Sequence, residues 1–409
     1  MADDQKRRTL LLSAFACKPE HGSEPGIGWG TLTLAAAIGN VVLLTSDANR
    51  EYIGDAIDRL KSVEVHYVRA PFRLAQVGEL GWRHRIDYLT WQLAAYRRAK
   101  VIVRTRRIDL IHHVTYGVSW MPSLLSLLNA PFVWSAGGID TTPWRFFSCM
   151  ALREGIREAA RTILVRTLAF PVRVAMARQA TLVLTTSDPS RFANPSGVRR
   201  HLQGGISAED ASRLQNGRSH CTPQPFRLLS VGRLVGLKGH GLALDAFARM
   251  QRALPDSEYW IVGDGPQRRW LEKRARALGC EASVKFLGEL SRSEALRLYR
   301  DCDAFVHLSF HESFGYAVVE AMAAGLPVVC LKHGAPAVLV DSSVGFAIEP
   351  KSPGQVVSEV AAILLELASH PEIGAAIGSQ AADRVASRWV WGLQVDVYRR
   401  LYSDALARK

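Results

Sequence analysis

The chain has 409 residues, of which 48% are hydrophobic and 22% are charged. This length predicts two domains, each large enough to bury a core, and the composition excludes a largely disordered chain, a collagen and a polytopic membrane protein. The formal net charge of +13 lies almost entirely in residues 1–220. A field of this sign favours anionic partners such as phosphates, nucleic acid or an acidic lipid surface.

Short apolar runs alternate with longer helical patterns along the whole chain. In the first half the predicted strands are Thr9–Ala14, Val41–Thr45, Val63–Val68, Leu110–His113, Phe132–Ser135 and Thr181–Thr185, and the predicted helices include Thr31–Ile38 and Met121–Leu128. In the second half the predicted strands are Arg227–Val231, Tyr259–Val262, Val284–Leu287, Ala304–Leu308 and Val328–Leu331, and the predicted helices include Gly241–Arg249, Gln267–Leu278 and Ser387–Leu406. Near-continuous apolar strands separated by helices indicate parallel sheets covered on both faces. Two such series predict an α/β fold with two doubly wound domains.

The segment 204–226 has little periodicity and many turn-forming residues, so it predicts the boundary between the domains. We expect an N-terminal domain over residues 1–205 and a C-terminal domain over residues 222–386. The six cysteines form no C-x-x-C pair and are predicted to be reduced. The polar start lacks an apolar signal core, and no uninterrupted apolar run reaches the length of a membrane span. We therefore expect a cytoplasmic protein.

The segment 232–239 follows a predicted strand and precedes a predicted helix, which is where open α/β sheets bind ligands. Arg233 and Lys238 are five residues apart on this glycine-bearing loop, so both can converge on one anion. An arginine fork and a lysine point charge make a good pair for a diphosphate. The alternative is a solvated loop with two surface cations.

A second candidate site is the segment 311–327, which predicts a helix from Phe314 to Gly325. The backbone N–H groups of residues 314–316 would point out of the helix start and form an anion site. Glu312 precedes the helix and Glu320 lies in its second turn, too far apart to act as an acid/base pair on one bond. The two carboxylates are predicted to bind two hydroxyl-bearing parts of one ligand, although Glu320 as a surface or capping carboxylate is the alternative.

Three weaker signals accompany these two segments. Gly263–Pro266 predicts a turn, and the glycine-rich loop 22–30 can cradle a phosphate but lacks the dinucleotide and P-loop fingerprints. The pair His112 and His113 ends a strand in the first domain, where a histidine can bond a sugar hydroxyl or be a satisfied structural residue. No metal is predicted, because the histidines and carboxylates lack ligand spacing.

The basic excess gathers in the segments 83–107 and 145–178. In the first, tryptophan and tyrosine residues are interleaved with the cations, and in the second Arg153, Arg157 and Arg161 form a helical stripe. Basic amphipathic helices of this kind suit an anionic membrane surface, and a solvated basic helix is the alternative. Nucleic acid is not expected, because no nucleic-acid-binding motif is present.

Taken together, these motifs resemble the retaining nucleotide-sugar glycosyltransferases of the GT-B fold, family 4, also called glycosyl transferases group 1. The resemblance covers nearly the whole chain and is strongest from Leu228 to Pro350. It rests on Arg233…Lys238-Gly239, on Gly263-Asp264-Gly265-Pro266 and on Glu312…Glu320 in that order. The loop from Ala16 to Gly26 is similar to a start found in polysaccharide-building members.

The resemblance implies two Rossmann-like domains facing across a cleft, with a last helix, about residues 387–409, packed back on the first domain. It implies catalytic roles for His113, Glu312, Arg233 and Lys238, of which the two cations neutralise the diphosphate without a metal. His112 leaves the histidine assignment ambiguous by one position. The residues that the resemblance assigns to donor binding are Gly26, Gly28, Leu290, Ser313, Phe314, Gly315, Tyr316 and Glu320. Leu290 would lie near the base, Glu320 would bind the ribose, and the two glycines would approach the phosphates.

The expected activity is metal-independent, retaining transfer of a sugar from a nucleotide diphosphate sugar to a lipid-linked saccharide acceptor. Such a reaction serves the synthesis of surface polysaccharide or glycolipid, at the inner face of the plasma membrane. One alternative is a nucleotide-sugar epimerase of the same fold. Another is a non-catalytic, basic membrane-binding module.

Overall fold

The computed structural model describes residues 8–72, 82–116, 121–167, 169–192, 194–215 and 225–408. Its contacts divide the chain into two compact units. Unit 1 consists of Met1–Ile139, Leu168–Gly205 and Trp391–Lys409, and unit 2 consists of Asp140–Thr167 and Ile206–Val390. Each unit is built on a parallel β-sheet, as the sequence predicts. The segment 140–167, which the sequence analysis placed in the N-terminal domain, packs with unit 2.

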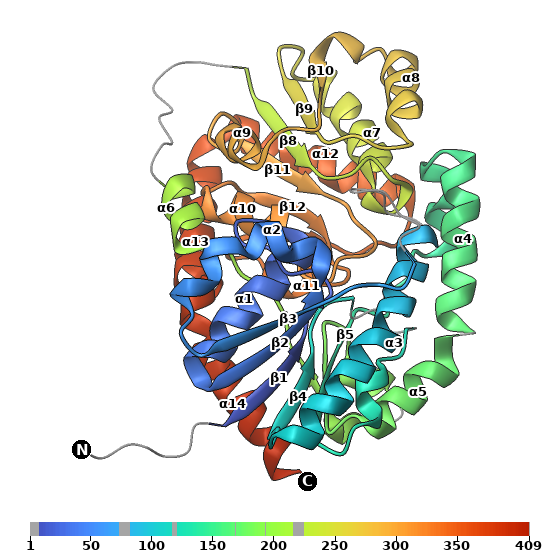
Figure 1. The fold of residues 1–409 in the computed structure, drawn as a ribbon. Helices are drawn as coiled ribbons and strands as arrows, with labels where there is room; N and C mark the ends of the chain where they lie inside the picture. The colour runs from blue at the N-terminus through green and yellow to red at the C-terminus, as the bar shows by residue number, and fades with distance from the viewer. Residues whose placement is uncertain are drawn as a thin grey trace. The chain divides into compact units, whose positions relative to one another are not determined.

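Unit 1 has a seven-stranded sheet in the order β3-β2-β1-β4-β5-β6-β7, with every pair parallel. Its strands are β1 Thr9–Ser13, β2 Asn40–Ser46, β3 Val63–Val68, β4 Leu110–His113, β5 Phe132–Gly137, β6 Leu182–Thr185 and β7 Val198–Arg200. Its α-helices are α1 Ser23–Ile38, α2 Arg50–Ile53, α3 Trp82–Thr105, α5 Ala169–Gln179 and α14 Val395–Ala407 (Figure 1). The six strands predicted in this half are all present. The short strand β7 was missed because two of its three residues are arginines.

The first helix is longer than the sequence indicates. The predicted helix Thr31–Ile38 begins at Ser23, so Gly26 and Gly28 lie inside α1 and not in a loop. A Cβ atom at Gly28 would come within 2.1 Å of the carbonyl oxygen of Ala16, so glycine lets the helix lie directly on the backbone that follows β1. The helix predicted over Met121–Leu128 is only a 3-10 turn at Leu124–Leu127.

Unit 2 has a six-stranded parallel sheet in the order β10-β9-β8-β11-β12-β13. Its strands are β8 Arg227–Val231, β9 Glu258–Val262, β10 Val284–Gly288, β11 Ala304–His307, β12 Val328–Leu331 and β13 Gly345–Ile348. Its α-helices are α4 Leu152–Arg166, α6 Ala208–Gln215, α7 His240–Gln251, α8 Arg268–Leu278, α9 Arg292–Leu298, α10 Tyr316–Ala323, α11 Pro336–Leu339, α12 Pro353–Ser369 and α13 Pro371–Arg388. Phe146, just before α4, is fully buried in the core of this unit, which explains why the segment 140–167 belongs here.

The end of the chain is two helices where the sequence predicts one over Ser387–Leu406. Helix α13 ends at Arg388 in unit 2 and α14 begins at Val395 in unit 1, so the chain changes units between them. Within unit 1, α14 packs beside α1 (Figure 1). The hydroxyl of Tyr402 on α14 lies 2.9 Å from Nδ1 of His112, which ties this helix to the sheet.

Five cysteines, at positions 17, 149, 280, 302 and 330, are free thiols, and Cys221 lies outside the described residues. In the described ranges, no single helix is long and apolar enough to cross a bilayer. Helices α12 and α13 meet that criterion only as a pair, and they are bent by 103°.

Several histidines are buried where their charged form is disfavoured. Burial lowers the pKa of His112 to about 3, of His113 to about 4 and of His201 to about 4, all in unit 1. The same cause lowers the pKa of His240 in unit 2 to about 3. These imidazoles stay neutral in the folded chain and become protonated near pH 6.5 when it unfolds.

We therefore expect the free energy of unfolding to fall as the pH drops below about 6.5, by about 1.4 kcal/mol per pH unit for each such histidine. The contribution is present above the unfolded pKa and is lost progressively toward the folded pKa. Urea unfolding of unit 1, measured between pH 7 and pH 5, should show a shallower pH dependence in His201→Phe than in the wild type. Equal slopes would contradict the burial argument for this histidine.

Candidate functional site

The loop after β8 is built on the backbone of a neighbouring turn. The N–H of Leu234 donates to the carbonyl of Asp264 at 2.9 Å. Cβ atoms at Gly263 and Gly265 would come within 2.2 Å of the Gly232 carbonyl oxygen and 2.6 Å of the Leu234 carbonyl oxygen. The Gly-Asp-Gly-Pro turn therefore supports the loop by close backbone packing, because any larger residue would push the loop away.

The side chains of the two predicted cations extend from this loop into different environments. The side chain of Arg233 is exposed and forms no ion pair with any described residue. Lys238 ends a 3-10 turn at Gly236–Lys238, and its ammonium group pairs with the carboxylate of Glu312. Gly239 follows with a φ of 70°, and a Cβ atom there would lie 2.0 Å from the carbonyl oxygen of Leu308. Glycine thus sets the direction in which Lys238 enters the site.

A residue that the sequence analysis did not single out holds the same turn. Oε2 of Glu154, on α4, accepts a hydrogen bond of 3.1 Å from the N–H of Gly236. The side chain of Glu154 is 8% exposed and its other oxygen pairs with Arg157 at 2.7 Å. No sequence signal separated Glu154 from the other charges of its helix, because Gly236 is 82 positions away.

Glu312 is the centre of a largely buried charge cluster. Its Oε1 atom accepts from the ammonium group of Lys238, and Nε2 of His307 lies 2.7 Å from the same oxygen. Burial alone would raise the pKa of Glu312, but Lys238 and His307 hold it well below its usual range. The carboxylate is therefore ionised, and its charge is balanced within unit 2.

The segment between Glu312 and α10 holds backbone N–H groups that form no hydrogen bond with any described residue. Helix α10 begins at Tyr316, two residues later than predicted, and Gly315 caps it with a φ of 89°. Among the described residues, no hydrogen-bond acceptor faces the N–H groups of Ser313, Phe314 and Gly315. Groups of this kind at a helix start are suited to an anion or to sugar hydroxyls. Leu290, predicted to lie near the base, is partly exposed between β10 and α9.

Glu320 lies in the second turn of α10 and is buried. Its Oε1 atom accepts from Arg292 at 2.7 Å, and its Oε2 atom accepts from the hydroxyl of Tyr299 at 3.0 Å. Arg292 also pairs with Asp210 at 2.9 Å. Glu320 is thus neither a surface nor a capping carboxylate. Arg292 and Tyr299 were not predicted, because they lie on and just beyond helix α9, which the sequence pattern did not indicate.

The remaining predicted residues belong to unit 1. Gly26 and Gly28 are buried in α1, and both histidines at the end of β4 are buried. Nε2 of His113 lies 2.9 Å from the hydroxyl of Tyr88, whereas His112 bonds Ser135 and the last helix. Within the described ranges, no three His, Cys, Asp or Glu side chains are grouped so that they could hold a metal ion.

Comparison with known proteins agrees with this geometry. The lipopolysaccharide outer core galactosyltransferase WaaB has a TM-score of 0.61 at 14% identity, over 97% of this chain and 99% of WaaB. The Anabaena protein HepE, solved in complex with UDP, has a TM-score of 0.62 at 22% identity, over 97% of this chain and 100% of HepE. Two parallel Rossmann-like sheets with these neighbours define the GT-B fold of glycosyltransferases. The predicted fold class is confirmed.

Residues 218–376 match the family model of the "Glycosyl transferases group 1". The D-inositol 3-phosphate glycosyltransferase of Corynebacterium kroppenstedtii is 29% identical over 226 residues, which are 51% of this chain and 49% of that protein. The chain thus spans about half the length of this curated relative. These matches confirm the resemblance to GT-B glycosyltransferases.

Two glycines with nearly the same backbone angle provide a matched test of packing in the loop 232–239. Gly279 has a φ of 73° with open space around its Cβ position, whereas Gly239 faces the carbonyl of Leu308. Gly279→Ala should cost about 1 kcal/mol of left-handed backbone strain. Gly239→Ala should cost at least about 2 kcal/mol more, because the added methyl group must displace a backbone carbonyl. Equal losses of stability in chemical unfolding would contradict close packing at Gly239.

Proposed function

We propose that the chain is a retaining, family 4 glycosyltransferase that transfers a sugar from a nucleotide diphosphate sugar to a saccharide acceptor. The observation that carries the proposal is the set of charges in unit 2. Four features lie on loops that follow β8 and β11: an ionised Glu312, its partner Lys238, an exposed Arg233, and the N–H groups of residues 313–315, which no described residue bonds. Such loops, at the carboxyl ends of parallel strands, form the ligand-binding edge of this class of sheet.

In this proposal the departing diphosphate is stabilised by Arg233, by Lys238 and by the N–H groups at the start of α10. These fixed positive groups supply the charge that a metal supplies elsewhere, so no metal is required. The bond between the sugar carbon and the phosphate oxygen breaks, and the acceptor hydroxyl oxygen bonds the same carbon from the same face. Its proton passes to the departing phosphate. The anomeric configuration is conserved because the new bond forms on the face that the phosphate leaves. His113 of unit 1 is assigned to the transferred sugar.

The relatives support the substrate classes. HepE was solved with UDP, which favours a uridine nucleotide as the donor. WaaB is a lipopolysaccharide galactosyltransferase, which favours a glycolipid acceptor. We assign the ribose to Glu320, the base to the neighbourhood of Leu290, and the transferred sugar to Glu312 with residues 313–316. Gly26 and Gly28 are assigned to the approach of unit 1 to the phosphates.

Calorimetric titration with UDP, GDP and ADP tests the donor site. One of them should bind to the wild-type chain, and Lys238→Ala should weaken that binding by at least about tenfold, the scale of one lost charge-assisted hydrogen bond. Lys332→Ala is the matched control, because Lys332 is also a lysine of unit 2 paired with a glutamate but is 55% exposed. If none of the three nucleotides binds, the proposal is wrong.

Product analysis separates the proposed transfer from the two alternatives. A retaining transferase should release UDP only when a saccharide acceptor is present. The new glycosidic bond should have the same anomeric configuration as the sugar–phosphate bond of the donor. An epimerised sugar or sugar nucleotide formed without acceptor would indicate an epimerase. Cellular function that survives both Lys238→Ala and Glu312→Ala would indicate a binding module.

The two basic helices support docking on an anionic membrane, and we include this in the proposal. On α3 of unit 1, Leu89, Leu93 and Val101 are exposed on the same helix as the cations Arg97, Lys100 and Arg104. Exposed apolar residues beside cations suit the boundary between headgroups and acyl chains. The place of action would be the inner face of the plasma membrane, where anionic lipids attract basic surfaces.

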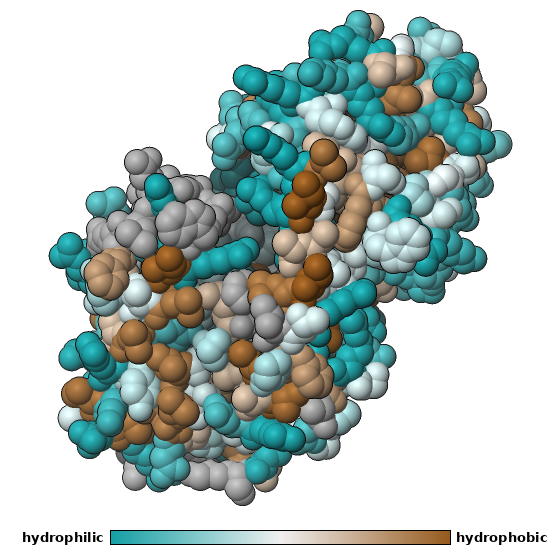
Figure 2. Space-filling model, turned by 90° about the vertical axis from the view of Figure 1, so that its right-hand side faces the viewer, coloured by the Kyte–Doolittle hydropathy of each residue, from teal (hydrophilic) through white to brown (hydrophobic). Residues whose placement is uncertain are grey.

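Helix α4 of unit 2 has its polarity reversed relative to a solvated helix. Leu152, Ile156 and Ile163 are 81%, 63% and 61% exposed, while Glu154 and Glu158 are buried. Figure 2 faces the side of the molecule on which Figure 1 labels α4, and apolar residues are exposed there beside hydrophilic ones. The stripe of three arginines expected from the sequence is incomplete, because Arg161 pairs with Glu158 and is 20% exposed.

Co-sedimentation with vesicles tests the membrane surface. Binding to vesicles rich in phosphatidylglycerol should exceed binding to phosphatidylcholine vesicles and should fall as salt is raised from 0.1 M toward about 0.5 M. Leu152→Glu combined with Ile156→Glu should reduce binding about tenfold or more, because each change removes apolar contact and adds negative charge. Leu393→Glu, at an apolar residue of unit 1 that is 55% exposed, is the control. Vesicle binding that does not change with salt concentration would contradict electrostatic docking.

A further inference from the structure

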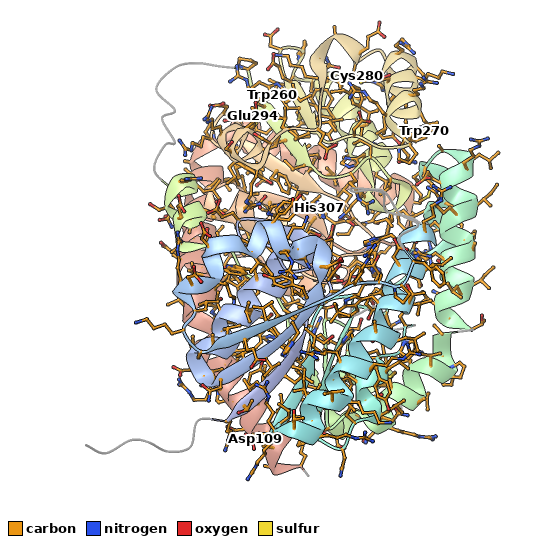
Figure 3. All side chains as sticks on the ribbon, in the orientation of Figure 1. Asp109, Trp260, Trp270, Cys280, Glu294 and His307 are labelled. Atoms are coloured by element: carbon orange, nitrogen blue, oxygen red, sulfur yellow. The ribbon has the colours of Figure 1, made fainter. Side chains whose placement is uncertain are left out.

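Of the side chains that bond Glu312 in the described part of the chain, His307 is the one that none of the motifs includes. It is the last residue of β11, where parallel pairing with Cys330 on β12 fixes its backbone. Its side chain is 6% exposed and its ring is nearly parallel to that of Phe305, at 11° and 6.0 Å between centroids. Figure 3 labels His307 among the side chains of unit 2. The imidazole is therefore held in one place by the strand and by packing.

The contacts of Glu312 are distributed unequally over its two oxygens. Lys238 and His307 both bond Oε1, and no described residue bonds Oε2. Glu320 is different, because both of its oxygens have a protein partner. One oxygen of Glu312 thus serves as an anchor while the other remains available to accept a hydrogen bond from a ligand hydroxyl.

Lys238 is a poor permanent anchor if the proposed function is correct. In that proposal, on which this inference rests, the ammonium group of Lys238 also neutralises the donor diphosphate. A dianionic diphosphate competes with the carboxylate for this cation, so its hold on Glu312 weakens when the donor binds. The side chain of His307 forms no second hydrogen bond with any described residue, so nothing in the proposed donor complex draws it away from Oε1.

We propose that His307 is a positioning residue that holds the Glu312 carboxylate with Oε2 directed at the transferred sugar. The Nε2–H group donates to Oε1 and thereby fixes the rotation of the carboxylate about its last side-chain bond. This contact acts on the sugar part of the donor and leaves the nucleotide part to Arg233, Lys238 and Glu320. It therefore predicts a loss that is confined to recognition of the sugar.

The measurement is calorimetric binding of matched ligands to the purified full chain: UDP, GDP and ADP, and the glucose esters of each. The readout is the ratio of the dissociation constants of the diphosphate and its sugar ester, for the nucleotide that binds best. His307→Phe keeps an aromatic ring against Phe305 but removes the donor group, and it should change this ratio by about tenfold with little change in diphosphate affinity. His307→Gln, whose amide can still donate, should keep the ratio within about threefold of the wild type.

A ratio that is unchanged in His307→Phe overturns the proposal, even if both affinities fall together, because packing alone would then explain the residue. The proposal is also overturned if His307→Gln changes the ratio of dissociation constants as much as His307→Phe does. Tyr299→Phe, which removes a donor from Glu320, is the control and should lower affinity for the diphosphate and for the sugar ester alike. If the wild type binds no nucleotide, the proposed function itself fails, which is distinguishable from failure at His307.

Discussion

The site in unit 2 depends on one buried negative charge, the carboxylate of Glu312. An ionised group in this environment is tolerated only when partners replace its lost hydration. Lys238 and His307 provide that replacement. Lys238 lies on the loop that follows β8, whereas His307 is the last residue of β11. The backbone must therefore bring these loops into hydrogen-bond contact, which explains why Gly239 has no room for a side chain against Leu308.

Glu312 and Glu320 differ in the hydrogen-bond partners of their carboxylate oxygens. Glu320 has both oxygens bonded, to Arg292 and Tyr299, and is a preorganised acceptor in a closed network. Glu312 has one oxygen anchored and one available. A closed network suits rigid hydroxyls that are the same in every substrate, whereas an available oxygen can discriminate among sugars. Under the proposed function, this arrangement would divide nucleotide binding from sugar binding between the two glutamates.

The fold and the motif residues could be predicted because their signals are local. Buried parallel strands are apolar runs, and ligands bind at their carboxyl ends, so Arg233, Lys238 and Glu312 were expected on loops after strands. They lie on the loops that follow β8 and β11. His307 sits at such a strand end and could have been found by the same rule. Arg292, Tyr299 and Glu154 could not, because each acts through a contact 21 to 82 positions away in the chain. The extent of α1 was missed because its glycines, which allow close packing, also resemble a loop.

Helix α4 carries both exposed apolar side chains and Glu154, which bonds the loop after β8. Its outward side chains, Leu152 and Ile156, alternate in sequence with Glu154, which holds the N–H of Gly236 two residues before Lys238. A charged group is buried on this helix while apolar groups are exposed, which is costly in water unless the inner contact and an outer partner both contribute. Because an α-helix moves as a rigid rod, a partner that fixes the outer face also fixes Glu154. Under the proposed function, membrane docking at this face and the geometry of the loop 232–239 would then stabilise each other, as reciprocal coupling between two sites requires.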